Sequence, residues 1–181
     1  MLAPRLGIGA KVLEIASGAG EHAIFVGGAL PGVQWVPSDP DPEARESIAA
    51  WVEESGLGNV ILPLDVDASR PERWPDGPFS AVVCINMIHI SPWSATEGLL
   101  AGAAKVLTEE GKLFLYGPYL EADVPTAPSN LTFDEYLKSR DPAWGLRDLT
   151  QVTALAAAHG FSLAERIEMP ANNLMVVFER T

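Results

Sequence analysis

The 181-residue sequence predicts an α/β fold built on a mostly parallel sheet, and three features carry that prediction. A short apolar run, Lys11–Ile15, leads into a loop that contains Gly18 and Gly20. Further apolar runs of strand length alternate with segments of helical periodicity. The last two apolar runs are separated by only five residues, as in an antiparallel hairpin.

Seven strands and five helices follow from the pattern in chain order. The strands are expected at residues 11–15, 33–36, 60–64, 79–86, 112–116, 161–168 and 174–180. Pro63 cannot donate a ladder hydrogen bond, so the third strand is expected at an edge. Helices are expected at residues 20–30 and 43–54, from a capping box of Ser94 and Glu97 to Leu107, in a short stretch capped by Thr132 with Glu135, and from Asp148 with Gln151 to His159.

The loop after the first strand is the strongest indication of a ligand. Gly18 and Gly20 permit backbone angles and a close approach that side chains would block. The free amides at the start of the next helix favour an electron-rich group. Two cofactors fit: a dinucleotide, because Gly18-x-Gly20-x-x-Ala23 satisfies the relaxed Rossmann fingerprint, and S-adenosylmethionine.

Glu14, four residues before Gly18, favours S-adenosylmethionine. Its carboxylate would repel a pyrophosphate but would hold the cationic aminoacyl end of S-adenosylmethionine. At this point the sequence resembles the class I methyltransferases, whose first motif runs acid-x-Gly-x-Gly-x-Gly. Ala16 stands where the first glycine is usual, and we expect it to allow close packing but to deny the loop a positive φ at that position.

Two further acids follow strands and are candidates for the nucleoside. Asp39 lies about twenty residues after the glycines, where dehydrogenases and class I methyltransferases alike hold the ribose hydroxyls; the alternative is a helix-capping acid. Asp67-Ala68 matches the acid-Ala pattern that contacts adenine in class I methyltransferases better than Asp65-Val66 does. Asp65 and Asp67 could instead be turn residues.

The reacting centre is expected at the carboxyl ends of the strands, where ligands sit in open parallel sheets. Asn86 and His89 follow one buried strand, and Tyr116 and Tyr119 follow the next. His89 is the candidate general base because its unperturbed pKa lies near neutrality; the alternative is a loop hydrogen bond. Residues 120–147 mix aromatic, Arg and Asp side chains and are predicted to form a substrate lid, or otherwise a surface loop docked by Trp144.

Six blocks together resemble the methyltransferase-like protein 26 family, methyltransferases of unassigned substrate. The blocks are Leu13–Gly18, Pro37–Asp39, Cys84–Met87, Tyr116–Tyr119, Trp144–Asp148 and Met169–Asn173. The resemblance implies one class I methyltransferase domain over residues 1–181, with a seven-stranded Rossmann-like sheet in the order 3-2-1-4-5-7-6. It also implies S-adenosylmethionine as cofactor. The expected cofactor-binding residues are Glu14, Ala16, Ser17, Gly18, Gly20, His22, Asp39, Asp67, Ala68 and Asn86. That family usually carries a further segment ahead of the first strand, so an open site, a lid from a partner chain or a shortened chain is expected here.

Composition limits the partners. The formal net charge is −12 and the twelve Lys and Arg are scattered, which argues against nucleic acid. Cys84, the only cysteine, lies in an apolar run and is expected as a buried thiol in a reducing cytoplasm. No membrane-spanning stretch, signal peptide or metal site is expected. The oligomeric state is left open, with a homodimer as one option.

Three functions remain. The first is methyl transfer from S-adenosylmethionine to a small-molecule acceptor, with Asn86, His89, Tyr116 and Tyr119 orienting the acceptor. The second is a non-catalytic cofactor-binding or scaffold module with the same fold. The third is an NAD-dependent oxidoreductase, against which Glu14 and the closing hairpin argue.

Overall fold

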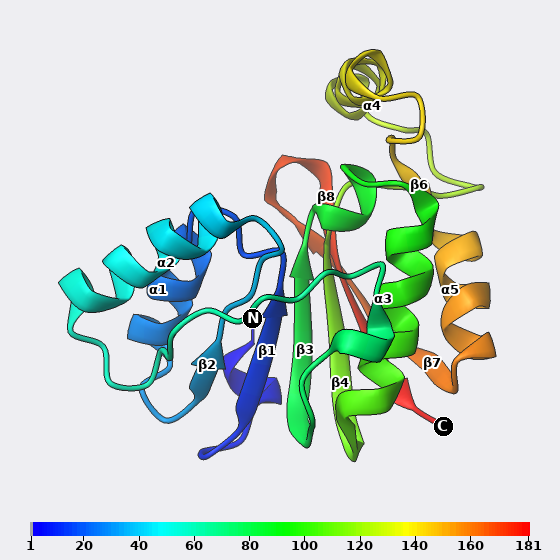
Figure 1. Ribbon diagram of the computed structural model, residues 1–181. Helices are drawn as coiled ribbons and strands as arrows, with labels where there is room; N and C mark the ends of the chain where they lie inside the picture. The colour runs from blue at the N-terminus through cyan, green and yellow to red at the C-terminus, as the bar shows by residue number, and fades with distance from the viewer. Residues whose placement is uncertain (1) are drawn as a thin grey trace.

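The computed structural model describes residues 2–181 and contains a six-stranded sheet in the order β2-β1-β3-β4-β8-β7 (Figure 1). Its strands are β1 (Lys11–Ile15), β2 (Gln34–Val36), β3 (Phe79–Ile85), β4 (Leu107–Gly117), β7 (Phe161–Met169) and β8 (Asn173–Arg180). The first four are parallel, and β8 runs antiparallel to both β4 and β7. The Rossmann-like sheet with an antiparallel hairpin is therefore confirmed, and the wholly parallel sheet that would favour a dehydrogenase is not found.

The strand order matches the expected one except that residues 60–64 are not a strand. Parallel pairing with β2 begins, since Trp35 N donates to Asn59 O at 2.8 Å and Ile61 N donates to Trp35 O at 3.0 Å. The next two donors of a regular ladder would be residues 37 and 63, and both are proline. Leu64 N bonds Pro37 O instead, at 3.0 Å, so only isolated bridges remain. The prediction of an edge position was right, and that of a strand was wrong.

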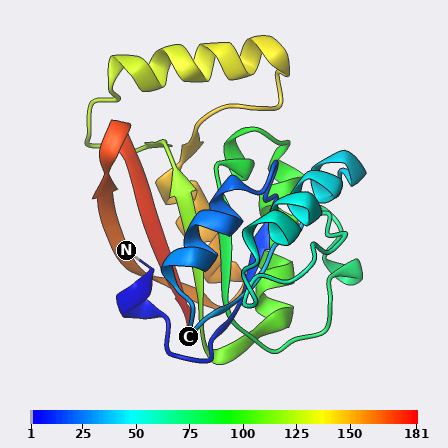
Figure 2. The same cartoon turned by 90° about the vertical axis from the view of Figure 1, so that its left-hand side faces the viewer.

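Alternating residues of the strands build two apolar layers, one on each face of the sheet, and the helices that cover these faces can be followed in Figure 2. Leu13, Val82 and Leu113 belong to the layer packed by α3 (Trp93–Val106) and α5 (Leu149–Ala158). Val12 and Val83 belong to the layer on the side of α1 (Glu21–Ala29), with α2 (Pro42–Ser55) alongside it. Because the strands end with side chains directed to both faces, the carboxyl edge can carry separate sites on its two sides.

Two predicted helix starts were wrong. No side chain caps α3, which begins at Trp93 after Pro92, so the capping box of Ser94 and Glu97 does not form. The helix α4 runs from Pro128 to Arg140, and Thr132 lies inside it with its hydroxyl bonded to Pro128 O. Proline suits the first turn of a helix, where its missing N–H costs nothing. Asp148 does cap α5, by accepting from the backbone N–H groups of Thr150 and Gln151.

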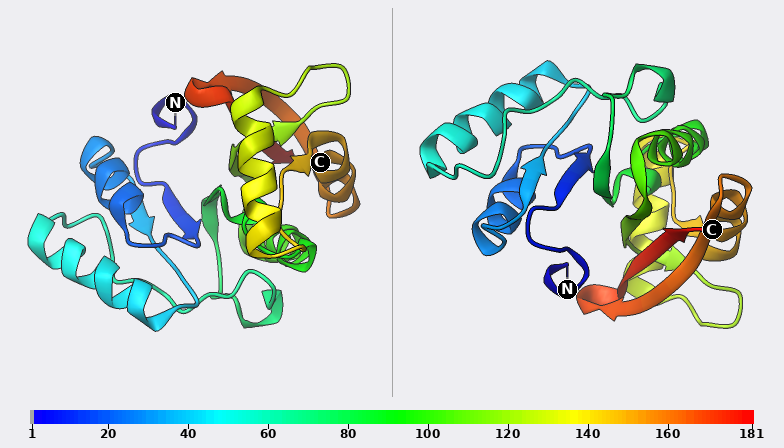
Figure 3. Two further views of the ribbon diagram at one scale, coloured as in Figure 1. Left: turned by 90° about the horizontal axis from the view of Figure 1, so that it is seen from above. Right: turned by 90° about the horizontal axis from the view of Figure 1, so that it is seen from below.

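The segment between β4 and α5 crosses the carboxyl edge of the sheet (Figure 3). It contains α4 and two short strands, β5 (Tyr119–Leu120) and β6 (Arg147–Asp148), which pair in parallel. Short 3₁₀ turns complete the chain at Ala3–Arg5, Pro71–Arg73, Met87–His89 and Pro170–Asn172. Among the described residues, no helix combines the length and the apolar character needed to cross a membrane.

Candidate functional site

The loop that follows β1 is held in a left-handed conformation at three positions. Ala16, Gly18 and Gly20 have φ values of 56°, 57° and 95°. The expectation that Ala16 would deny the loop a positive φ was wrong, since alanine adopts that angle here at a typical cost of about 1–2 kcal/mol. Gly20 is needed for a second reason, because a Cβ there would lie 3.0 Å from Ile48 Cγ1 and 3.1 Å from Ile48 Cα in α2.

Ser17 and Asp39 tie this loop to the segment after β2. Ser17 N donates to Ser38 O at 2.8 Å, and the Ser17 hydroxyl accepts from Ser38 N at 3.1 Å. Asp39 is 8% exposed, and its two carboxylate oxygens accept from Gly18 N and Asp41 N, each at 3.0 Å. Each oxygen keeps a second lone pair, so Asp39 can hold the loop and still accept from a hydroxyl. The helix cap is Asp41, which accepts from Glu43 N.

Glu14 is a buried carboxyl beside the loop. It is 1% exposed, and its carboxylate accepts from Trp35 Nε1 at 2.9 Å. Burial raises its pKa, although the hydrogen bond from Trp35 opposes this change. Its side chain shares the face of Val12, and His22, at the start of α1, lines an apolar groove on that same side. Glu14 and His22 thus lie on the α1 side of the carboxyl edge.

A cavity of about 240 Å³ lies on the other side of that edge, between the end of β1 and the start of α3. Its walls are mostly apolar, with Ile15, Val66 and Met87 among them, while Asp67 and Ala68 contribute the predicted acid-Ala pair. Asp67 is also a turn residue, because it accepts from the backbone N–H and the hydroxyl of Ser69 at 2.8 and 2.6 Å. Asp65 is exposed, does not line the cavity, and pairs with Arg45 at 3.4 Å.

Asn86 and Tyr116 meet where β3 and β4 end. Asn86 has φ 60°, and its N–H donates to Tyr116 O at 2.8 Å. The Tyr116 hydroxyl accepts from Asn173 Nδ2 at 3.1 Å, which brings the tip of the β7–β8 hairpin to the same place. Both side chains are partly exposed. Asn86 and Tyr116 therefore remain available to a ligand at this edge.

His89 and Tyr119 also come together, but both are buried. Their rings make an edge contact with centroids 4.9 Å apart. His89 is fully buried, and burial lowers its pKa to about 3, so the imidazole is neutral. Its Nδ1 accepts from Arg147 N at 3.2 Å, while within residues 2–181 neither His89 Nε2 nor the Tyr119 hydroxyl has a hydrogen-bond partner. This geometry agrees with the alternative of a loop hydrogen bond and weighs against a general base.

Two residues that the sequence did not single out hold this arrangement. The Arg147 guanidinium donates to Ile88 O at 2.7 Å and to Ser91 O at 2.5 Å, so it joins β6 to the loop after β3. Gly117 leaves room for His89, because a Cβ at that position would lie 2.6 Å from His89 Nε2. Both residues fall within the blocks that carry the family resemblance, and that was the only signal for them.

The model of a family described as "Protein of unknown function (DUF938)" matches residues 3–180, nearly the whole chain. The chain belongs to the DUF938 family. That description does not name the methyltransferase-like protein 26 family, so the finer resemblance stays a prediction for this DUF938 chain.

Several solved structures with the same fold are described as methyltransferases. The mitomycin 7-O-methyltransferase MmcR is 21% identical with a TM-score of 0.82, over 96% of this chain and 49% of that one. CalO1 is described as a methyltransferase in calicheamicin biosynthesis, and its structure is of the SAH-bound form. It is 17% identical with a TM-score of 0.80, over 99% of this chain and 52% of that one. An O-methyltransferase family protein from Burkholderia thailandensis is 15% identical with a TM-score of 0.84, over 99% of this chain and 54% of that one. The DUF938 chain thus has the class I methyltransferase fold and spans about half the length of these structures.

Proposed function

We propose that this protein is an S-adenosylmethionine-dependent methyltransferase acting on a small molecule. The observation that carries the proposal is the 240 Å³ cavity beside the left-handed loop at the end of β1. Ligand sites for drug-sized molecules usually hold about 300–1,000 Å³, so this cavity suits the adenosine end of the cofactor, with the methionine end over the loop. The fold shared with CalO1, described in its SAH-bound form, supports the same cofactor.

Each residue of the proposed cofactor site has a physical role. The apolar walls around Met87 would cover the adenine, with Asp67 accepting from its amino group and the Ala68 amide meeting the ring. Asp39 would accept from a ribose hydroxyl with its remaining lone pairs. Glu14, kept from full solvation, would balance the positive charge of the aminoacyl end across the loop. Ser17 N, Gly18 N and Gly20 N already bond protein oxygens, so among the loop amides the one at Ala19, which has no partner within residues 2–181, would face the carboxylate of that end.

When bound, the cofactor would supply an electrophilic methyl group on a sulfonium for transfer to a nucleophile of the acceptor. The protein's task is then to orient the acceptor and to exclude water. We assign this orienting role to Asn86 and Tyr116, and their partly exposed side chains at the carboxyl edge support the assignment. We further propose that the 120–147 segment acts as the lid, since α4 crosses that edge.

Calorimetry with S-adenosylmethionine and with NAD, side by side, tests the proposal. We expect micromolar binding of the former alone. Asp39→Ala should weaken that binding at least tenfold, whereas Asp65→Ala, an exposed acid outside the cavity, should leave it unchanged. Binding of NAD alone, or equal S-adenosylmethionine affinity in the two variants, would contradict the assignment.

A non-catalytic cofactor-binding module is the second candidate. The burial of His89 and Tyr119 favours it, because neither group can take a proton from an acceptor in this conformation. Cofactor binding without methyl transfer to any member of a broad panel of hydroxyl and amine metabolites would support this candidate over the first.

A further inference from the structure

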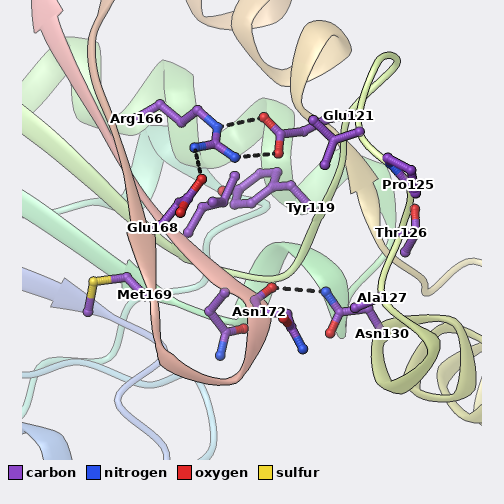
Figure 4. Close-up of a pocket in the computed structure, with 13 residues that line it drawn as sticks. Tyr119, Glu121, Pro125, Thr126, Ala127, Asn130, Arg166, Glu168, Met169 and Asn172 are labelled. Atoms are coloured by element: carbon purple, nitrogen blue, oxygen red, sulfur yellow. Dashed lines mark hydrogen bonds and ion pairs between the residues drawn. The ribbon is translucent and has the colours of Figure 1, made fainter.

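A second cavity, of about 270 Å³, lies under the 120–147 segment (Figure 4). It is enclosed by the connection from β5 to α4 on one side and by the tip of the β7–β8 hairpin on the other. Pro125, Ala127 and Leu174 supply apolar walls, and Tyr119 lies at its base. Since Tyr119 contacts His89 and the hairpin tip contacts Tyr116, this cavity adjoins the place where β3 and β4 end.

The charged side chains of this cavity are one arginine and two glutamates. Arg166 donates to both oxygens of Glu121, at 2.7 and 2.8 Å, and to Glu168 at 3.2 Å. The bidentate bond with Arg166 lowers the pKa of Glu121, so this carboxylate stays ionised at neutral pH. Three of the five guanidinium N–H groups bond these glutamates, and the group of three carries one net negative charge. The cavity therefore disfavours anions.

Three asparagines give the cavity its hydrogen-bonding character. Asn130 Nδ2 donates to Asn172 O at 2.9 Å, and Asn173 Nδ2 donates to Pro170 O at 3.2 Å. A carbonyl can only accept, so these two amides are oriented with their nitrogens toward the protein. Across residues 2–181, no protein donor reaches the side-chain oxygens of Asn130, Asn172 or Asn173. The groups left for a ligand are thus mainly acceptors.

The hairpin tip is held in an unfavourable backbone conformation. Ala171 and Asn172 both have φ 58°, so two successive non-glycine residues are left-handed. Such a conformation costs about 1–3 kcal/mol per residue and persists only where its surroundings impose it. Asn130, only 8% exposed, helps to hold the tip through its bond to Asn172 O. The cavity wall is accordingly fixed by the protein before any ligand binds.

We propose that this cavity is the acceptor pocket and that it recognises a small molecule carrying an ammonium group. Carboxylates and amide oxygens without donors match the three N–H groups of an ammonium, and the apolar walls match a short hydrocarbon or aromatic body. The ammonium is the recognition group; its nitrogen has no lone pair while protonated and is not thereby the methylated atom. The acceptor role of this cavity rests on the proposed methyltransferase function. The ligand class is argued from the side chains that line the cavity alone.

Three probes of one size and different charge test the ligand class: benzylamine, benzyl alcohol and benzoate. We expect benzylamine to shift the side-chain amide NMR signals of the three asparagines, benzyl alcohol to do so more weakly, and benzoate not to do so. Glu168→Gln, a change at a carboxylate that is 82% exposed, should weaken benzylamine binding about two- to five-fold without affecting folding. Equal binding of benzoate and benzylamine, or no change in Glu168→Gln, would overturn the ligand class.

A pair of matched variants tests the location. Ala127→Phe adds a ring inside the cavity, whereas Ala122→Phe adds the same ring at an exposed position of the same connection, outside the cavity. Benzylamine should lose its effect in the first variant and keep it in the second; retention in both would overturn the location. Calorimetry with S-adenosylmethionine separates the two proposals. Cofactor binding without a benzylamine effect overturns the pocket alone, and a benzylamine effect without cofactor binding overturns the methyltransferase and the acceptor role.

Discussion

Replacing Arg147 with methionine should weaken the attachment of the 120–147 segment to the loop after β3, leaving, among the described residues, only hydrogen bonds from backbone N–H groups to His89. The guanidinium bonds the Ile88 and Ser91 carbonyls, and it lies over the Trp93 ring with its carbon 5.6 Å from the centroid. Bonds to charged groups contribute about 1.5–3 kcal/mol each. The site is only half-buried, so we take the lower end for both bonds and expect a loss of about 3 kcal/mol in the free energy of unfolding. For a chain of this size that loss lowers the melting temperature by roughly 6–12 °C.

Urea unfolding followed by circular dichroism measures the loss. Arg140→Met is the control, because Arg140 is exposed at the end of α4 and makes no hydrogen bond or ion pair with the other described residues. It should change the unfolding free energy by less than about 0.5 kcal/mol. Arg147→Lys should fall between the two, since an ammonium cannot reproduce the fork of a guanidinium. A loss in Arg147→Met no larger than in Arg140→Met would refute the idea that this guanidinium joins the two segments.

Three further predictions concern buried groups. Because the pKa of Glu14 is raised in the folded state, the native protein binds more protons than the unfolded one above pH 4.5, and its stability falls as the pH rises toward the folded-state pKa. Glu14→Gln should therefore gain stability relative to wild type over that range, by about 1.4 kcal/mol for each pH unit, and parallel pH profiles in urea unfolding would contradict this. The lowered pKa of His89 has the opposite sign and costs stability as the pH falls below 6.5; its ring signals in NMR should not titrate between pH 5 and 8. Gly117→Ala should destabilise by about 1–3 kcal/mol through the clash with His89, compared with a near-neutral Gly58→Ala, where a Cβ meets no atom within 4 Å; equal melting temperatures for the two would count against the close contact.

The sequence predicts most of this fold because each buried strand is a short apolar run. The β1 and β3 runs are mostly apolar and buried on both faces, so they could be placed without knowing their partners. The 60–64 segment could not be assessed in the same way. Its failure as a strand depends on Pro37 and Pro63 meeting at consecutive positions of one ladder, and that is known only once the pairing register is known.

In the candidate site, too, the residues marked by local sequence patterns could be predicted, and those that depend on long-range contacts could not. The spacing of Asp39 from the glycine loop and the acid-Ala pattern of Asp67-Ala68 indicated where these acids would lie. Asp39 follows β2, and Asp67 follows the 60–64 segment that bridges to the β2 region. The burial of His89 depends on Arg147, which is 58 residues further along the chain and delivers its N–H to the imidazole. No local pattern around His89 reports that contact, so its residue type alone made it look like a base.

The paired prolines beside β2 also determine how this molecule meets others. An exposed sheet edge presents free N–H and C=O groups that can capture a strand from a second chain, and long flat edges of this kind lead to aggregation. Here the β2 edge is covered by a segment that cannot continue the ladder, because Pro63 lacks a donor and the register shifts at Leu64. An incoming strand would find no regular series of hydrogen-bonding partners. The irregularity that removes the seventh strand therefore protects this side of the protein against edge-to-edge polymerisation.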